Sequence, residues 1–214
     1  MRFPYMLRLS VITAFVLSCG RAHATPEQDF WKWFQSNENS LFDFEKDQER
    51  TFDRLAAEMH KLNPNLTFEF GPKKDGCREF TISADGIREA FPAVEKLYAA
   101  APPLPRWKIL KFRQRHKPFD IESGGVSVKA ALVAVQVTPN GQTVDLTIFI
   151  PGYTQDAYKK YAPIVFLLLD QALGEYDVET RVGQINIEST SKAGGKTCSL
   201  EALPREVDAL FAKK

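Results

Sequence analysis

The sequence contains few of the residues from which metal and redox sites are built. Its 214 residues include three cysteines and three histidines, and none of these has a partner at the spacing of a zinc site or of a Cys-x-x-Cys motif. It also lacks a Gly-rich phosphate loop and a Gly-x-Ser-x-Gly nucleophile motif. The sequence therefore predicts no metal site and no cofactor. It leaves enzymatic activity uncertain and favours a non-catalytic role.

Long apolar runs are also scarce, and the longest one lies at the N-terminus. Arg2 and Arg8 precede the apolar stretch 9–17, and Ala22-His23-Ala24 supplies the small-x-small pattern that signal peptidase recognises. The stretch is too short to span a bilayer. Residues 1–24 are therefore predicted to be an export signal, and the mature chain is predicted to lack a transmembrane segment and to be periplasmic or secreted.

A lipoprotein signal is the alternative interpretation of the same segment. Cys19 follows Val16-Leu17-Ser18, and a cysteine at such a place can carry a lipid anchor. The residues before Cys19 fit the lipid-attachment pattern poorly, so cleavage after Ala24 is the preferred interpretation.

The sequence has no strong excess of charge of either sign. Its formal net charge is +1, and removal of residues 1–24 takes away three arginines and no acidic residue, which changes the charge to −2. A general affinity for nucleic acid or for an anionic membrane depends on a basic surface. We therefore expect no nucleic-acid partner.

Two cysteines, Cys77 and Cys198, remain after removal of the signal. An even number of cysteines in an exported chain is compatible with a disulfide. The alternative is a pair of free thiols, because the sequence does not show whether the two residues approach each other.

The rest of the chain contains both helical and strand patterns. Thr25 and Pro26 begin a helical segment that extends to Leu62, either as one helix or as two with a break at Ser36–Ser40. Alternating apolar residues then predict strands, and Asp75-Gly76 and Asn140-Gly141 are hairpin turns. These patterns predict an α+β fold in which a long N-terminal helical segment packs on an antiparallel sheet.

The predicted elements follow the order β-β-α-β twice, over residues 66–115 and 126–188. The helix of the first unit is predicted from about Gly86 to Ala100, and the first strand of the second unit is predicted over residues 126–138. A short link is predicted to follow Gly174. These two segments are either an internal repeat or a chance similarity. We expect a single domain over residues 25–190, followed by a polar C-terminal tail over 191–214 with one short helix. In the second unit, an amphipathic helix begins near Asp156 and stops at Gly174, and Asp170 falls on its polar, solvated side.

The third strand of the first unit carries the candidate site. An alternation of period two places Trp107, Lys111, Arg113 and Arg115 on one outward face. A row of cations binds a carboxylate or phosphate well, and arginine does so with two hydrogen bonds. The alternative is that Glu69 and Glu79 on neighbouring strands neutralise these cations as cross-strand ion pairs. This polar face is either a ligand cleft or open to solvent.

Several segments resemble a group of bacterial proteins of unassigned function, from about Phe30 to Glu188. The segments are SLFDFEKDQERTFDRLAAEM, LTFEFGP, REFTISADGIREAFPAVEKL, LPRWKILKFRQR and FLLLDQALGEYDVETRVG. The resemblance implies no catalytic residue.

The sequence therefore predicts an exported binding or interaction module. Its expected partner is a small anionic ligand or a protein, bound by Trp107, Lys111, Arg113, Arg115, Glu69 and Glu79. The alternative is a cofactor-independent hydrolase in which Glu69 or Glu79 is the acid or base beside the cations.

Overall fold

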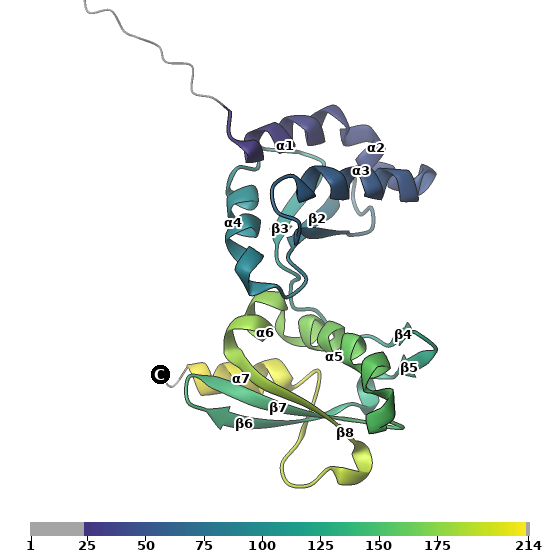
Figure 1. Cartoon of the computed structure of the whole chain (residues 1–214), viewed down its shortest axis with the longest axis vertical. Helices are drawn as coiled ribbons and strands as arrows, with labels where there is room; N and C mark the ends of the chain where they lie inside the picture. Colours follow the sequence, from purple (N-terminus) through teal and green to yellow (C-terminus); the bar gives the residue numbers. More distant parts are fainter. Residues whose placement is uncertain (1–23, 213–214) are drawn as a thin grey trace, which may run out of the picture.

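The computed structural model describes residues 24–212, and these form two lobes joined by a short linker (Figure 1). We call residues 24–111 the N-lobe, residues 112–120 the linker and residues 121–212 the C-lobe. Each lobe is a sheet with helices, as expected for the α+β class. The predicted export signal lies outside the described residues, apart from Ala24.

The N-lobe is one sheet covered by helices on one face. Its elements are α1 (Pro26–Ser36), α2 (Glu38–Phe42), η1 (Phe44–Lys46), α3 (Gln48–His60), β1 (Thr67–Phe70), β2 (Arg78–Ser83), η2 (Arg88–Ala90), α4 (Phe91–Ala99) and β3 (Trp107–Lys111). The strand order is β1-β2-β3, with β1 antiparallel and β3 parallel to β2. The parallel pair follows from the connection through α4, because parallel strands need such a crossover.

The C-lobe contains a four-stranded sheet and a small hairpin. Its elements are β4 (Ile121–Ser123), β5 (Val126–Val128), η3 (Ala130–Leu132), β6 (Ala134–Asn140), β7 (Thr143–Ile150), η4 (Gln155–Ala157), α5 (Tyr158–Leu173), α6 (Glu175–Arg181), β8 (Val182–Ser189), η5 (Thr190–Lys192), β9 (Cys198–Ser199) and α7 (Leu203–Phe211). The order of the larger sheet is β8-β7-β6-β9, and β7 and β8 are parallel. Both lobes therefore combine an antiparallel hairpin, a helical connection and a strand parallel to the second hairpin strand. Common descent of the two units stays a prediction.

Local sequence signals account for the clearest boundaries. Thr25 caps α1 in a capping box with Gln28. The helical segment from Pro26 to His60 is broken at Asn37, Asp43 and Asp47, which separate α1, α2, η1 and α3. Asp75 and Gly76 both have positive φ in the turn between β1 and β2, a conformation that Asp-Gly adopts readily in hairpins. Gly174 ends α5 with φ 81°.

Three elements differ from the sequence-based prediction. The helix expected from about Gly86 begins instead at Phe91, because Asp85 and Gly86 both adopt positive φ and form a turn. The long strand expected over residues 126–138 is interrupted by η3. The link expected after Gly174 is the helix α6.

The described residues bury two hydrophobic cores, one in each lobe. The N-lobe core is rich in aromatic rings, and Phe34, Phe80 and Trp107 meet at its centre. The C-lobe core contains α5, the sheet and the C-terminal segment that was predicted to be a polar tail. Leu203 and Val207 of α7 are fully buried there, so this segment completes the second core. Among residues 24–212, no helix has the length and apolar character needed to cross a membrane.

Candidate functional site: a charged cleft between the lobes

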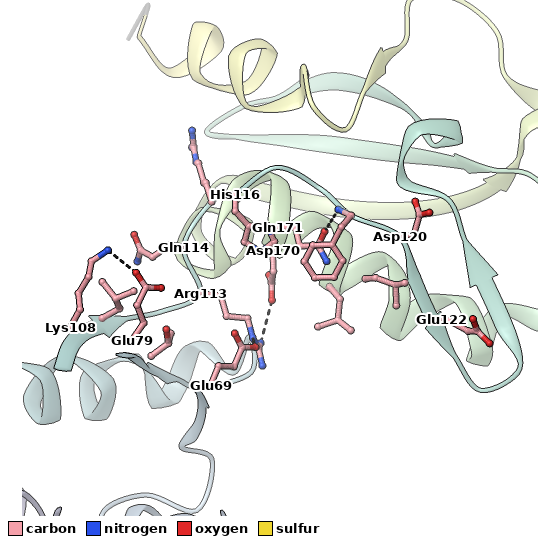
Figure 2. Close-up of a pocket in the computed structure, with 16 residues that line it drawn as sticks. Glu69, Glu79, Lys108, Arg113, Gln114, His116, Asp120, Glu122, Asp170 and Gln171 are labelled. Carbon is pink, nitrogen blue, oxygen red and sulfur yellow. Dashed lines mark hydrogen bonds and ion pairs between the residues drawn. The ribbon is translucent and has the colours of Figure 1, made fainter. Parts of the chain in front are cut away.

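A cleft of about 860 Å³ lies between the two lobes (Figure 2). One wall is the face of the N-lobe sheet that points away from the aromatic core. The opposite wall is α5 of the C-lobe, and the linker and β4 complete the lining. A second hollow of about 580 Å³ continues from it between α5 and the turn at Asp85, and the two share Arg113, Leu167 and Asp170. The candidate site is therefore built by both lobes.

Strand alternation explains the sheet wall. Glu69, Thr81 and Leu110 lie side by side on β1, β2 and β3, and all three line the cleft. The neighbouring pair Glu79 and Lys108 lies on the same face, with 2.8 Å between Oε1 and Nζ. The residues between them point into the aromatic core, as period two requires. Glu69 and Glu79 are thus on the cleft face, as the sequence predicted.

Trp107 is not part of this face, which corrects the prediction. Its ring is buried in the N-lobe core, where it contacts Phe34, Phe42 and Phe70. The prediction places the two faces of the strand the wrong way round, because it treats Arg113 and Arg115 as part of β3, which ends at Lys111. The true cleft residues of β3 are Lys108 and Leu110.

The strand ends at Lys111, and the next residue changes the direction of the chain. Phe112 has φ 61°, a conformation that non-glycine residues rarely adopt. Its ring is buried against Phe91 of α4 and Tyr176 of α6. Lys111 lies on the same face of β3 as Trp107, which the helices cover, and pairs with Glu95 of α4 at 3.2 Å. After the change of direction at Phe112, Arg113 and Arg115 line the cleft, whereas Lys111 does not.

Arg113 is the central cation of the cleft. Its guanidinium donates to Glu69 at 2.5 Å and pairs with Asp85 at 2.9 Å and Asp170 at 3.3 Å. Burial alone would lower the pKa of Arg113. The hydrogen bonds that Arg113 donates to Glu69 and Asp85, and the negative charges of these two carboxylates, raise the pKa above its ordinary value. Because three carboxylates from both lobes surround this side chain, which is only 14% exposed, Arg113 has little capacity left for an anionic ligand.

Asp170 is buried, contrary to the prediction that it is solvated. Its residue exposure is 9%, because the N-lobe and linker cover the polar side of α5. Burial raises the pKa of Asp170 to about 7, with a lowering effect from Arg113 and further raising effects from Glu175 and Glu179. Asp170 is therefore the carboxyl group of the cleft that can exchange a proton near neutral pH.

Glu175 joins the lobes beside the cleft, and the sequence analysis did not identify it. Its side chain is fully buried. One carboxylate oxygen accepts from the backbone N–H groups of Ala84 at 2.9 Å and Gly86 at 3.2 Å, and the other accepts from Arg113 N–H at 3.0 Å. Its only sequence signal is a position directly after Gly174, at the start of a helix.

Arg115 is also committed to internal contacts. It donates to the carbonyl of Leu173 at 2.7 Å, to Asp208 of α7 at 2.7 and 2.9 Å, and to Asp177 of α6. These hydrogen bonds fasten the linker to the C-lobe. The hydrogen bonds that Arg115 donates to Asp208 raise the pKa of Arg115, and burial partly offsets this effect.

The two cysteines belong to different lobes. Cys77 follows the turn between β1 and β2 and is exposed, whereas Cys198 lies in β9 and is half-buried. Both are free thiols in the structure. Burial raises the pKa of the Cys198 thiol, which makes it a weaker nucleophile at neutral pH.

Searches for related proteins and for metal clusters gave no assignment. No family model, no curated protein and no solved structure matches the chain. Within residues 24–212, no group of three or more histidine, cysteine, aspartate or glutamate side chains is arranged to hold a metal ion. Any functional conclusion therefore depends on the cleft itself.

Proposed function

We propose that this protein is a non-catalytic binding module whose ligand site is the cleft between the lobes. The observation that carries the proposal is that both lobes contribute charged side chains to one cleft, where Arg113 pairs with Glu69 of the N-lobe and Asp170 of the C-lobe. Binding sites are typically concave, largely preformed, and lined by a mixture of apolar surface and a few fixed polar groups. The cleft has this character, with Leu110, Phe119 and Leu167 as its apolar part.

The test compares two exposed leucines. Leu167 lines the cleft and is 38% exposed, whereas Leu132 is 59% exposed in η3 and lies outside it. Full-length protein recovered from its own cells is analysed by native mass spectrometry for a retained small molecule or protein. We expect wild type and Leu132→Arg to retain the ligand and Leu167→Arg to lose it. Equal retention by all three proteins would place the binding site elsewhere.

A second candidate function is acid–base catalysis by Asp170, which replaces Glu69 and Glu79 as the candidate acid or base. The favouring observation is that burial raises the pKa of Asp170 to about 7 at the edge of the cleft. A group that titrates near the working pH is well suited to general acid–base catalysis. If the protein is a hydrolase, Asp170→Asn should abolish turnover while Glu122→Gln, in β4 at the same cleft, retains it.

We also propose that the protein is exported, on the sequence of residues 1–24 alone. The mass of the denatured mature protein tests this proposal. Cleavage after Ala24 gives a chain that begins at Thr25, whereas lipidation gives a heavier chain that begins at Cys19. An uncleaved chain would contradict export by this signal. The same mass shows whether Cys77 and Cys198 become oxidised to a disulfide.

A further inference from the structure

The charged groups that line the cleft and its side hollow are predominantly acidic. Three cations line them, Lys108, Arg113 and Arg115, against seven carboxylates. Arg115 is held by Asp177 and Asp208, which do not line either hollow. The cations are therefore occupied, and a surplus of carboxylates faces the cleft.

One of these carboxylates is half-buried and forms neither a hydrogen bond nor an ion pair within residues 24–212. Glu179 of α6 lines the side hollow and makes no hydrogen bond or ion pair with the described residues. Its carboxylate lies close to Gly86, since a Cβ at that glycine would be 3.0 Å from Oε1 of Glu179. Burial raises the pKa of Glu179 and the charge of Glu175 adds to this effect, whereas the charge of Arg88 lowers the pKa. A partly desolvated carboxylate without a hydrogen bond is costly, and a bound cation would reduce this cost.

An apolar surface lies next to Glu179. Pro163, Phe166, Leu167 and Asp170 follow the spacing i, i+3, i+4 and i+7 on α5, so they share one face of the helix, and all four line the side hollow. Phe166 and Leu167 are both more than one-third exposed. The side hollow thus combines an aromatic and aliphatic wall with Asp170, Glu179 and Asp85.

We propose that this side hollow binds an organic cation, an ammonium or guanidinium group that carries an apolar arm. The cation lies between Glu179 and Asp170, and the arm packs on Phe166 and Leu167. Charge-assisted hydrogen bonds to carboxylates and contact with an aromatic face both favour such a group. The inference depends on the proposed binding function and replaces the anionic ligand predicted from the sequence, because Arg113 is already surrounded by Glu69, Asp85 and Asp170.

The test uses three probes that share a phenylalkyl arm and differ in the terminal group, which is cationic, neutral or anionic. They are 4-phenylbutylamine, 4-phenylbutanol and 4-phenylbutyrate, and a fourth probe, N-acetyl-phenylalanyl-arginine amide, presents the cation as a peptide side chain. Each is titrated at millimolar concentration into the full mature chain, and the shift in unfolding temperature is measured. We expect stabilisation by the amine, by the peptide or by both, and none by the butyrate. Whichever of the two binds more tightly identifies the source of the cation. A shift by the butyrate as large as by the cations, or no shift by either cation, would overturn the inference.

Two variants locate the binding site. Glu179→Gln removes the unpaired carboxylate, and we expect about tenfold weaker binding of the cation because a charge-assisted hydrogen bond is lost. Glu49→Gln is the matched control, since Glu49 is an exposed residue of α3 on the other side of the N-lobe sheet. Equal binding by both variants would contradict the assigned site.

The outcome for the cation is separable from the proposed function. If a retained ligand is lost from Leu167→Arg but the amine binds no better than the butyrate, the cleft is the binding site and only the ligand class is wrong. If the retained ligand is unaffected by Leu167→Arg, the cleft itself is wrong.

Discussion

At the scale of single residues, two buried carboxylates define the junction between the lobes. Asp170 and Glu175 are both on the C-lobe side of the cleft, yet their environments are opposite. Glu175 accepts three backbone N–H groups, whereas Asp170 has only the Arg113 guanidinium at 3.3 Å. Buried charges are tolerated when hydrogen bonds satisfy them. The two residues therefore have different consequences for stability.

Asp170 should make the stability of the protein depend on pH. Its folded pKa of about 7 lies above the ordinary value of 3.8, so the folded state binds a proton that the unfolded state lacks between these values. Stability therefore falls as pH rises through this window and is lowest above it. The groups that face Asp170 are Arg113 of the linker and Glu175 and Glu179 of α6.

Urea denaturation of wild type and Asp170→Asn checks this expectation. The wild type should lose stability, on the order of a few kcal/mol, between about pH 4 and pH 7 relative to the variant. Asp53→Asn, at an exposed position of α3, is the control and should follow the wild type. If the free energy of unfolding varies with pH in the same way for wild type and Asp170→Asn, folding does not raise the pKa of Asp170.

Glu175→Ala should destabilise the protein strongly. The substitution leaves the N–H groups of Ala84, Gly86 and Arg113 without their acceptor. Each unsatisfied buried donor costs about 1–3 kcal/mol, so a loss of about 3 kcal/mol or more is expected by chemical denaturation. Glu49→Ala, at an exposed position of α3, is the control and should change stability by less than about 0.5 kcal/mol. Similar losses in the two variants would contradict the role of Glu175.

At the scale of elements, the junction between α5 and α6 decides where the linker lies. Gly174 has φ 81° and ψ 145° between the two helices. A Cβ at this position would lie 3.2 Å from the carbonyl oxygen of Arg113, and that oxygen accepts from Glu175 N–H. Gly174 is therefore required both for its backbone conformation and for the close approach of the linker.

Gly174→Ala should cost about 2 kcal/mol or more, because φ is positive and the new methyl group meets backbone. Thermal denaturation followed by circular dichroism measures the loss. Gly194 is the matched control, since a Cβ there has no atom within 4 Å, and Gly194→Ala should be nearly neutral. A neutral Gly174→Ala would mean that the linker does not approach α5 so closely.

Elements also show how far the sequence could predict this fold. The α1 capping box, the Asp-Gly turn and the stop at Gly174 are local features, and the structure contains all three. The candidate site was predicted in part. Glu69, Glu79, Arg113 and Arg115 line the cleft, but Trp107 and Lys111 do not, because the positive φ of Phe112 ends the alternation. The alternation of residues along a strand does not indicate such a change of chain direction.

At the scale of the whole molecule, the two cores are joined tightly despite their separate sheets. Phe91 of the N-lobe stacks on Tyr176 of the C-lobe, and Phe112 of the linker contacts the same ring at a tilt. Arg113 and Glu175 add polar contacts between the lobes. Because apolar and polar contacts both cross the junction, we expect the two lobes to unfold as one cooperative unit.

The positions of the tryptophans allow a direct test. All three, Trp31, Trp33 and Trp107, are in the N-lobe, so their fluorescence reports that lobe alone, whereas far-UV circular dichroism reports both. The two urea transitions should coincide in the wild type and separate in Glu175→Ala, whose lobes have lost the hydrogen bonds from Ala84 and Gly86 to Glu175. Transitions that already differ in the wild type would show that the lobes unfold independently.

Local sequence patterns account for the α+β class of this protein, for its helix caps and turns, and for the shared outward face of Glu69 and Glu79. These features depend on residues close to one another in the chain. The tertiary structure decided that there are two cores, that Asp170 is buried and that Arg113 is enclosed by carboxylates of both lobes. Glu175 contacts residues about 90 positions away, and the energetic value of such contacts depends on how the lobes pack, which local pattern does not specify.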